Sequence, residues 1–274
     1  MIIDSTKIKN YMGFDFISGA ELSKKFKDQF LNRHYLEHKI DEVIKINSHK
    51  NGFEVVTTQK DRFLTRALII ATGMKRRQLG IPGEDRLLRK GVSHSVLQDT
   101  SLFAGKRIIV IGGGNSGVQT ARNLLQVGCH VTLVEKAHLR ADASEIGALK
   151  KQPRAEILER YDAIEIIGKE KVEAVIVQSM RDLAKRKIPC EGVFIQVGLT
   201  PNTAFCEDIL ELNEKGEIKT FGDCSTSVEG VFACGDVTDV FAKRIIIASG
   251  EGAKAALRAK QYLYEKKNES AGKI

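Results

Sequence analysis

Apolar residues in the first part of the chain change from helical spacing to strand-like alternation. Between residues 14 and 30 they recur every three or four positions, which predicts an amphipathic helix. Stretches rich in β-branched and alternating apolar residues then predict strands over residues 40–46, 52–58 and 67–71. We therefore expect a mixed α/β arrangement from the start of the chain.

The centre of the chain carries the strongest pattern. Residues 107–111 form a continuous apolar run with β-branched side chains, as is typical of a parallel strand buried on both faces. The run leads directly into a glycine-rich turn, and a helix with one apolar face follows until Gly128, which is placed to end it. A second strand is predicted over residues 130–135.

The rest of the chain continues the mixture of strands and helices. We predict strands over residues 163–167, 172–177 and 192–197, a basic loop around residues 181–187, a strand over residues 230–233 and a helix over residues 249–266. This order of elements predicts an α/β protein with two sheet systems.

The turn after residues 107–111 has the composition of a dinucleotide-binding turn. Three glycines at GxGxxG spacing lie between a buried strand and a helix, and Glu135 ends the next strand. Glycines at these positions permit a tight turn and a close approach of the backbone to a pyrophosphate, while the start of the helix offers N–H groups. Ser116 is also a candidate cap for that helix. The residues predicted to bind the nucleotide here are Gly112, Gly114, Asn115, Ser116 and Gly117; the alternative is a purely structural glycine turn.

Glu135 indicates which nucleotide is preferred. A carboxylate at the end of the second strand accepts hydrogen bonds from the ribose hydroxyls and repels a 2′-phosphate, so NADH is favoured over NADPH. Lys136 and Arg140 follow closely and would soften that repulsion. We include both in the predicted cofactor site.

Composition and charge leave the predicted fold unchanged, but they argue against several classes of protein. The 274 residues are 42% apolar and 28% charged, which is typical of a globular chain. No apolar run reaches the roughly 18 residues of a membrane helix, and no signal-peptide pattern opens the chain. We expect a cytoplasmic protein that neither enters a membrane nor, since its basic clusters are short and lack interleaved aromatic residues, binds nucleic acid.

Cysteine and histidine spacing predicts no metal site and no disulfide framework. The five cysteines include no CxxC, and among the six histidines His34 and His38 are four residues apart without a third ligand nearby. The net charge of +8 would favour acidic partners, such as an acidic electron carrier of the ferredoxin kind.

Several blocks together resemble the thioredoxin-reductase-like class of pyridine nucleotide-disulfide oxidoreductases, and within it the flavoprotein branch of the alkyl hydroperoxide reductases. The resemblance extends over most of the chain, from about residue 8 to residue 264. The blocks that carry it are residues 67–73, 81–85, 111–117, 196–203, 230–236 and 245–253.

This resemblance implies a two-domain FAD/NAD(P)-binding Rossmann-like fold. In it an NAD(P)H domain, residues 77–196, interrupts an FAD domain formed by residues 1–76 and 197–274. A Gly-Asp motif, here Gly235 and Asp236, holds the ribityl-pyrophosphate part of FAD, and the segment after it lies beside the isoalloxazine. The resemblance also implies a homodimer. Further cofactor contacts are implied at Ala71, Thr72, Gly73, Gly198, Lys243, Arg244 and Ile245.

The first departure from the family pattern concerns the redox dithiol. The family has a CxxC followed by Asp between residues 81–85 and the nucleotide glycines, whereas Ser95 and Gln98 stand at the cysteine positions here. Neither side chain can form a disulfide or a flavin–thiolate adduct. Asp99 matches the acidic residue of the family and is the candidate catalytic residue, with a structural carboxylate as the alternative.

The second departure concerns the start of the chain. The family begins with a strand, a glycine turn and a helix that bind the ADP half of FAD, whereas residues 6–14 here resemble the segment after that unit. We therefore expect an N-terminally truncated FAD domain with weakened FAD binding, in a fragment or in a protein that has abandoned tight FAD binding.

These observations leave different classes of function open. The first is an NAD(P)H-dependent flavin oxidoreductase that passes a hydride from NADH to FAD and electrons on to a small-molecule or protein acceptor other than a dithiol. The second is a non-catalytic NAD(H)-binding module or a fragment of such a reductase. Disulfide reductase activity is not expected without the dithiol.

Overall fold

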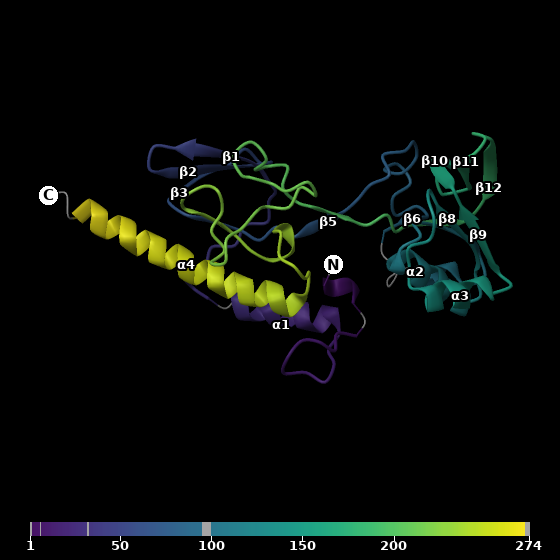
Figure 1. Cartoon of the computed structure of the whole chain (residues 1–274), viewed down its shortest axis with the longest axis horizontal. Helices are drawn as coiled ribbons and strands as arrows, with labels where there is room; N and C mark the ends of the chain where they lie inside the picture. Colours follow the sequence, from purple (N-terminus) through teal and green to yellow (C-terminus); the bar gives the residue numbers. More distant parts are fainter. Residues whose placement is uncertain (1, 6, 32, 95–99, 272–274) are drawn as a thin grey trace. The chain divides into compact units, whose positions relative to one another are not determined.

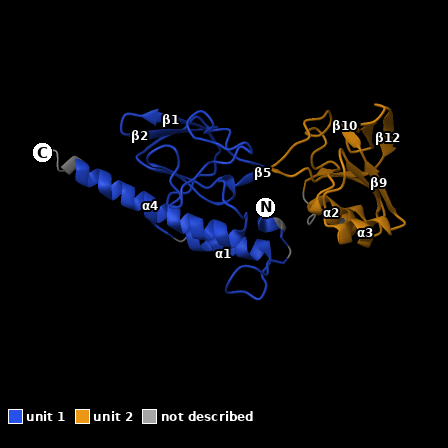
Figure 2. Ribbon diagram, in the orientation of Figure 1, with its two compact units in different colours: residues 1–75, 200–274 blue, residues 76–199 orange. Residues whose placement is uncertain are grey.

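The chain forms two compact units in a computed structural model, which describes residues 2–5, 7–31, 33–94 and 100–271. Unit 1 comprises Met1–Lys75 and Thr200–Ile274, and unit 2 comprises Arg76–Leu199 (Figure 2). The segments that join them contain two paired strands, β5 (Met74–Arg76) and β14 (Leu199–Pro201). The boundaries proposed from the sequence lie at residues 76/77 and 196/197, and each unit is described by itself below.

Unit 2 is built on a five-stranded parallel sheet. Its strands, in spatial order, are β6 (Val92–Ser93), β13 (Gly192–Ile195), β7 (Arg107–Ile111), β8 (His130–Glu135) and β9 (Ala155–Glu159). Strand β7 lies in the middle, with Ile109 opposite both Val193 and Thr132. A strand in this position is buried on both faces, which explains why its sequence is apolar throughout.

The two faces of this sheet have different covers (Figure 1). Ile108 and Val110 face helices α2 (Asn115–Gln126) and α3 (Ala143–Lys150), and α2 contributes Val118 and other apolar residues to that core. Ile109 and Ile111 pack on the other face, in a core shared with an antiparallel sheet. The strands of that sheet are β10 (Tyr161–Ile167), β11 (Ala174–Ser179) and β12 (Lys185–Pro189).

Unit 1 combines a β-meander, a short parallel strand pair and two long helices. The elements are α1 (Gly19–Leu31), the meander β1 (Val43–His49), β2 (Gly52–Thr57) and β3 (Arg62–Thr65), the pair β4 (Leu68–Ile70) and β15 (Val231–Ala233), and α4 (Ile245–Ala271). Small residues Ala255 and Ala259 bring α4 close to Phe232 of β15. The start of α4 packs near α1, since Ile245 contacts the core of Ile8, Ile17 and Leu22 (Figure 1).

The structure corrects the start of one predicted helix and the type of one predicted segment. The predicted helix over residues 14–30 begins at Gly19, because Ile17 bonds to Ile8 in extended conformation and the Ser18 hydroxyl caps the N–H of Glu21 at 3.2 Å. The basic stretch predicted as a loop contains edge strand β12, whose backbone pairs with β11 while its lysines point to solvent.

Candidate functional site

The turn after β7 has the conformation that its glycines allow. Gly112 has a φ of +115°, and a Cβ there would lie 2.2 Å from the carbonyl oxygen of Gln196. At Gly117, on the first turn of α2, a Cβ would lie 1.8 Å from the Gly112 carbonyl oxygen. The first and third glycines of the motif therefore let the helix pack directly on the turn.

Gly114 serves a different purpose. It is the N-cap of α2, with a φ of −82°, and a Cβ there would meet nothing within 4 Å. The space beside the helix N-terminus is therefore open, as a pyrophosphate that approaches the backbone amides would require. The predicted cap by Ser116 was wrong: Gly114 is the N-cap without a side-chain bond, and Ser116 lies inside the helix, where its carbonyl accepts the Thr120 hydroxyl at 2.6 Å.

Glu135 lies at the end of β8 and forms a hydrogen bond to the backbone of this turn. Its side chain is only 6% exposed, and its two carboxylate oxygens accept N–H groups from Gly113 at 2.6 Å and Ala137 at 3.0 Å. The Arg140 guanidinium lies 3.7 Å away and is 73% exposed. The carboxylate thus lies at the predicted place, but its strongest partners here are backbone amides.

The neighbouring predicted residues have partners of their own. The Lys136 ammonium forms an ion pair of 2.6 Å with Asp162. Asn115 uses its side-chain oxygen to accept the Asp142 N–H at 2.9 Å, which ties the start of α2 to the start of α3. Of the two cations among these candidates, Lys136 is held by Asp162, whereas Arg140 is 73% exposed and lies 3.7 Å from Glu135.

The other glycine-containing segments predicted from the resemblance flank the connecting strands. In unit 1, residues 72 and 73 follow the predicted contact Ala71 and are both bonded to Asn202. The Thr72 hydroxyl donates to the Asn202 carbonyl at 2.8 Å, and the Asn202 N–H donates to the Gly73 carbonyl at 3.0 Å. In unit 2, the carbonyl of Gly198 accepts the Arg77 N–H at 3.1 Å. These bonds link residues 72–73 to Asn202 and Arg77 to Gly198, and the cofactor contacts expected at these segments stay predictions.

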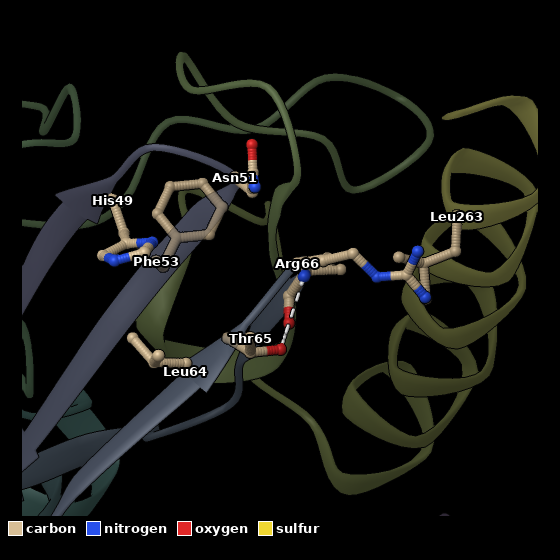
Figure 3. A pocket seen from close by; sticks show the side chains of 8 residues that line it. His49, Asn51, Phe53, Leu64, Thr65, Arg66 and Leu263 are labelled. Carbon is tan, nitrogen blue, oxygen red and sulfur yellow. Dashed lines mark hydrogen bonds between the residues drawn. The ribbon is translucent and has the colours of Figure 1, made fainter. Parts of the chain in front are cut away.

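Unit 1 contains a hollow of about 530 Å³ between the meander and α4 that holds none of the predicted residues (Figure 3). Phe53 and Leu64 provide apolar walls from β2 and β3, and Leu263 faces them from α4. The Thr65 hydroxyl beside it is already bonded to the Ala67 carbonyl at 2.8 Å.

A cavity of about 500 Å³ in the same unit does contain predicted residues. Asp236, Lys243, Arg244 and Ile245 line it on one side. Asp236 is half-buried and has no hydrogen-bond or ion-pair partner within the described ranges, and α4 begins at Ile245, so a carboxylate and free helix N–H groups face one space. A ligand with sugar hydroxyls and electron-rich carbonyl oxygens fits these groups.

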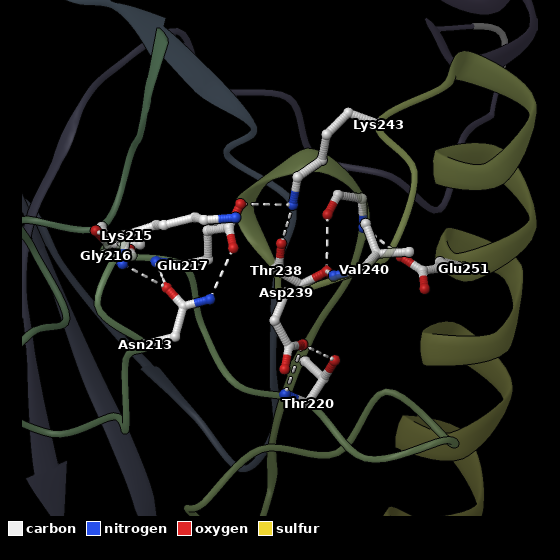
Figure 4. Close-up of polar contacts among 12 residues, drawn as sticks. Asn213, Lys215, Gly216, Glu217, Thr220, Thr238, Asp239, Val240, Lys243 and Glu251 are labelled. Atoms are coloured by element: carbon white, nitrogen blue, oxygen red, sulfur yellow. Dashed lines mark hydrogen bonds and ion pairs between the residues drawn. The ribbon is translucent and has the colours of Figure 1, made fainter.

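The predicted flavin contact Lys243 lines this cavity, but its ammonium is bonded to other groups of the protein (Figure 4). Its ammonium forms an ion pair of 3.1 Å with Glu217 and also contacts the Thr238 carbonyl. Burial raises the pKa of Glu217, but hydrogen bonds from Asn213 and Lys243 outweigh burial and leave that pKa below its ordinary value. The cation is therefore already matched by a nearly buried carboxylate.

Part of the wall of the cavity at Asp236 was not predicted from the sequence. Lys7, Asn10 and Phe26 line it from the N-terminal segment and α1. The resemblance of residues 6–14 to a family segment pointed to this region, but no residue type within it signalled a wall more than 200 positions from α4 in the sequence.

The structure does not test the candidate dithiol positions. Ser95, Gln98 and the candidate catalytic residue Asp99 lie outside the described residues. All five cysteines are described, and each is free and buried. No described group of three or more His, Cys, Asp or Glu side chains is arranged to hold a metal ion, and no helix in the described ranges is long and apolar enough to cross a bilayer.

Comparisons with known proteins agree with this arrangement. The pattern of the family described as pyridine nucleotide-disulphide oxidoreductase matches residues 8–259. The F component of alkyl hydroperoxide reductase in Staphylococcus epidermidis is 38% identical over 266 residues, and that in Escherichia coli is 37% identical over 278 residues. These matches cover 95% and 97% of this chain but 52% of each relative, so the chain spans about half the length of these curated relatives.

Solved structures give the same family. Thioredoxin reductase of Lactococcus lactis superimposes with a TM-score of 0.79 at 32% identity, over 96% of this chain and 87% of that one. Thioredoxin reductase of T. acidophilum gives 0.76 at 34% identity, over 97% and 86%. The family match over residues 8–259 and these relatives agree with the two units and the glycine turn, and the chain belongs to the pyridine nucleotide-disulphide oxidoreductase family.

Proposed function

We propose that this chain is the nucleotide- and flavin-binding part of an NAD(P)H-dependent oxidoreductase, which takes a hydride from NADH in preference to NADPH. The observation that carries the proposal is the turn around Gly114, where an open space adjoins the N-terminus of α2. The amides at this helix start would hold the pyrophosphate.

The preference for NADH rests on Glu135. Its carboxylate retains lone pairs for ribose hydroxyls after accepting two backbone N–H groups, and it would repel a 2′-phosphate. Lys136 is engaged by Asp162, which leaves the exposed Arg140 as the cation that would offset the repulsion.

The cavity in unit 1 would hold FAD. When bound, this group supplies the redox chemistry, accepting the hydride and releasing electrons to an acceptor. Asp236 would accept a hydroxyl hydrogen bond from the ribityl chain, and the start of α4 with Arg244 would orient the electron-rich edge of the isoalloxazine.

We propose an acceptor other than a dithiol relay within this chain. The sequence contains no CxxC, and burial raises the pKa of Cys190 to about 12 and the pKa values of Cys206 and Cys234 to about 11. Such thiols stay protonated near neutral pH and are poor nucleophiles. A small molecule or a separate redox protein is the acceptor class that fits; a cytoplasmic location and a homodimer stay predictions.

NADH oxidation by the purified chain with added FAD tests this function. The visible spectrum after incubation with FAD and desalting is recorded first, and turnover is then measured with ferricyanide and with dithionitrobenzoate. We expect flavin bands that desalting reduces but does not abolish, turnover with ferricyanide and none with dithionitrobenzoate. Binding of NADH without turnover above free FAD would favour the non-catalytic module instead, and rapid dithionitrobenzoate reduction would contradict the acceptor class.

A further inference from the structure

The turn that carries Asp236 is closed by its own hydrogen bonds. Gly235 has a φ of +75°, and its carbonyl accepts both the N–H of Thr238 at 3.0 Å and the Thr238 hydroxyl at 2.8 Å. These bonds leave Asp236 at the centre of a single tight turn. Its position in the cavity therefore depends on what holds that turn in place.

The turn is held from one side by α4. The Glu251 carboxylate, on the second turn of the helix, accepts the Gly235 N–H at 2.9 Å. This bond fixes the beginning of the turn against the helix whose N-terminus lines the cavity.

Lys243 holds the turn from the other side. Its ammonium contacts the Thr238 carbonyl, at the end of the turn, and pairs with Glu217 at 3.1 Å (Figure 4). Glu217 is only 12% exposed on its side chain and is itself fixed by the Asn213 amide at 2.7 Å. The lysine is therefore tied between the turn and an anchored carboxylate.

Arg244 makes an informative contrast. Arg244 follows Lys243 in the sequence, lines the same cavity and is exposed, and its guanidinium has no ion-pair or hydrogen-bond partner within the described ranges. Of these adjacent cations, Arg244 keeps its charge available to a ligand, whereas the charge of Lys243 is already satisfied by the protein.

We propose that Lys243 is a positioning residue of the flavin site, which acts through Glu217 and the Thr238 carbonyl to fix the turn that presents Asp236, and that it does not contact the flavin. The inference rests on the proposed function, because it concerns the same FAD site. It assigns direct cation contact to Arg244.

A double-mutant cycle on FAD affinity separates positioning from contact. The dissociation constant for FAD is measured by quenching of flavin fluorescence for wild type, Lys243→Met, Glu217→Gln and the double variant. We expect each single change to raise the dissociation constant for FAD about tenfold, as for one lost charge-assisted bond. The dissociation constant of the double variant should be no higher than the higher of the two single-variant values. Losses that multiply in the double variant would overturn the proposal.

Arg244 supplies the matched comparison. Arg244→Met should weaken FAD binding by a factor that multiplies with that of Glu217→Gln, because the two residues act separately. Lys219→Met, which breaks an exposed pair of 3.6 Å with Glu211, should leave FAD affinity unchanged and controls for loss of a nearby positive charge.

A conservative variant and the flavin spectrum distinguish positioning from general damage to the fold. Lys243→Arg can still reach Glu217 and should restore most of the affinity, and FAD-saturated Lys243→Met should have the wild-type visible spectrum. A shifted spectrum or an Arg variant as weak as the Met variant would overturn the proposal. If Lys243→Met does not fold, Lys243→Gln replaces it in the same cycle. A wild-type chain that binds no FAD would refute the proposed function itself, an outcome distinct from a multiplicative cycle in a chain that binds.

Discussion

Alanine at the second glycine of the nucleotide turn should impair binding without damaging the fold. Gly114 has backbone angles that alanine tolerates, and its Cβ would meet no atom within 4 Å. The added methyl group would instead occupy the space in which the pyrophosphate approaches the helix amides. Gly117→Ala is the matched comparison, because its Cβ would lie 1.8 Å from the Gly112 carbonyl oxygen and force the backbone apart.

Gly114→Ala should mainly change the affinity for NADH, whereas Gly117→Ala should mainly change the folding stability. Gly114→Ala should lower the free energy of unfolding by at most about 1 kcal/mol, the difference between glycine and alanine at an N-cap. Loss of one charge-assisted bond to phosphate, worth about 1.5–3 kcal/mol, should weaken NADH binding roughly 10- to 150-fold. Gly117→Ala should cost about 2–3 kcal/mol of folding stability through overpacking alone.

Calorimetric titration with NADH and urea unfolding of the apo chain measure the two quantities separately. Gly114→Ala with wild-type NADH affinity would show that the nucleotide does not approach this helix start. An unfolding free energy as low as that of Gly117→Ala would show that the space at Gly114 is not open.

Three further outcomes are expected. Glu135→Gln should cost about 1–2 kcal/mol of stability, because an amide replaces an oxygen that accepts a backbone N–H, and should raise NADPH affinity relative to NADH in paired titrations; an unchanged ratio would remove Glu135 as the selectivity residue. Hydrogen bonds from Ser225, with a further one from Arg258, lower the pKa of Asp223 from 3.8 to about 2. The contribution of Asp223 to stability is thus complete above about pH 4 and is lost as the pH falls toward 2. The urea midpoint of Asp223→Asn should therefore fall less steeply between pH 4 and pH 2 than that of the wild type. An equally steep fall in both proteins would argue against the lowered pKa. The five buried thiols should react with dithionitrobenzoate at pH 8 far more slowly in the native chain than in guanidinium, and immediate labelling of two thiols would reveal an accessible pair.

The nucleotide turn could be predicted because its parts are consecutive in the chain. A buried strand, three glycines, a helix and a second strand ending in Glu135 occupy one continuous stretch, and the close packing of the turn requires glycine at positions 112 and 117. The resemblance to a family likewise depended on residue order. It predicted cofactor contacts at Asp236 and at residues 243–245, and the structure shows these residues around one cavity. A continuous stretch of this kind determines the local backbone conformation, which can be predicted directly from a single sequence.

Tertiary structure decided which distant groups meet. The run at residues 107–111 is apolar throughout, so only folding shows that Ile108 faces helices while Ile109 faces the antiparallel sheet. Strand β12 was missed because a backbone ladder with β11, rather than its charged side chains, holds it in place.

The partner of Lys243 could not be read from the sequence for the same reason. A lysine beside a predicted flavin site carries a charge in any conformation, and nothing in the pattern of residues indicates whether that charge faces a ligand or a carboxylate. Glu217 comes from a turn 26 positions earlier, and packing of that turn against residues 237–239 brings the two side chains to 3.1 Å. The sequence by itself determined the local backbone of the nucleotide turn, whereas the partner of each charge depended on contacts between distant segments, which only the folded chain brings together.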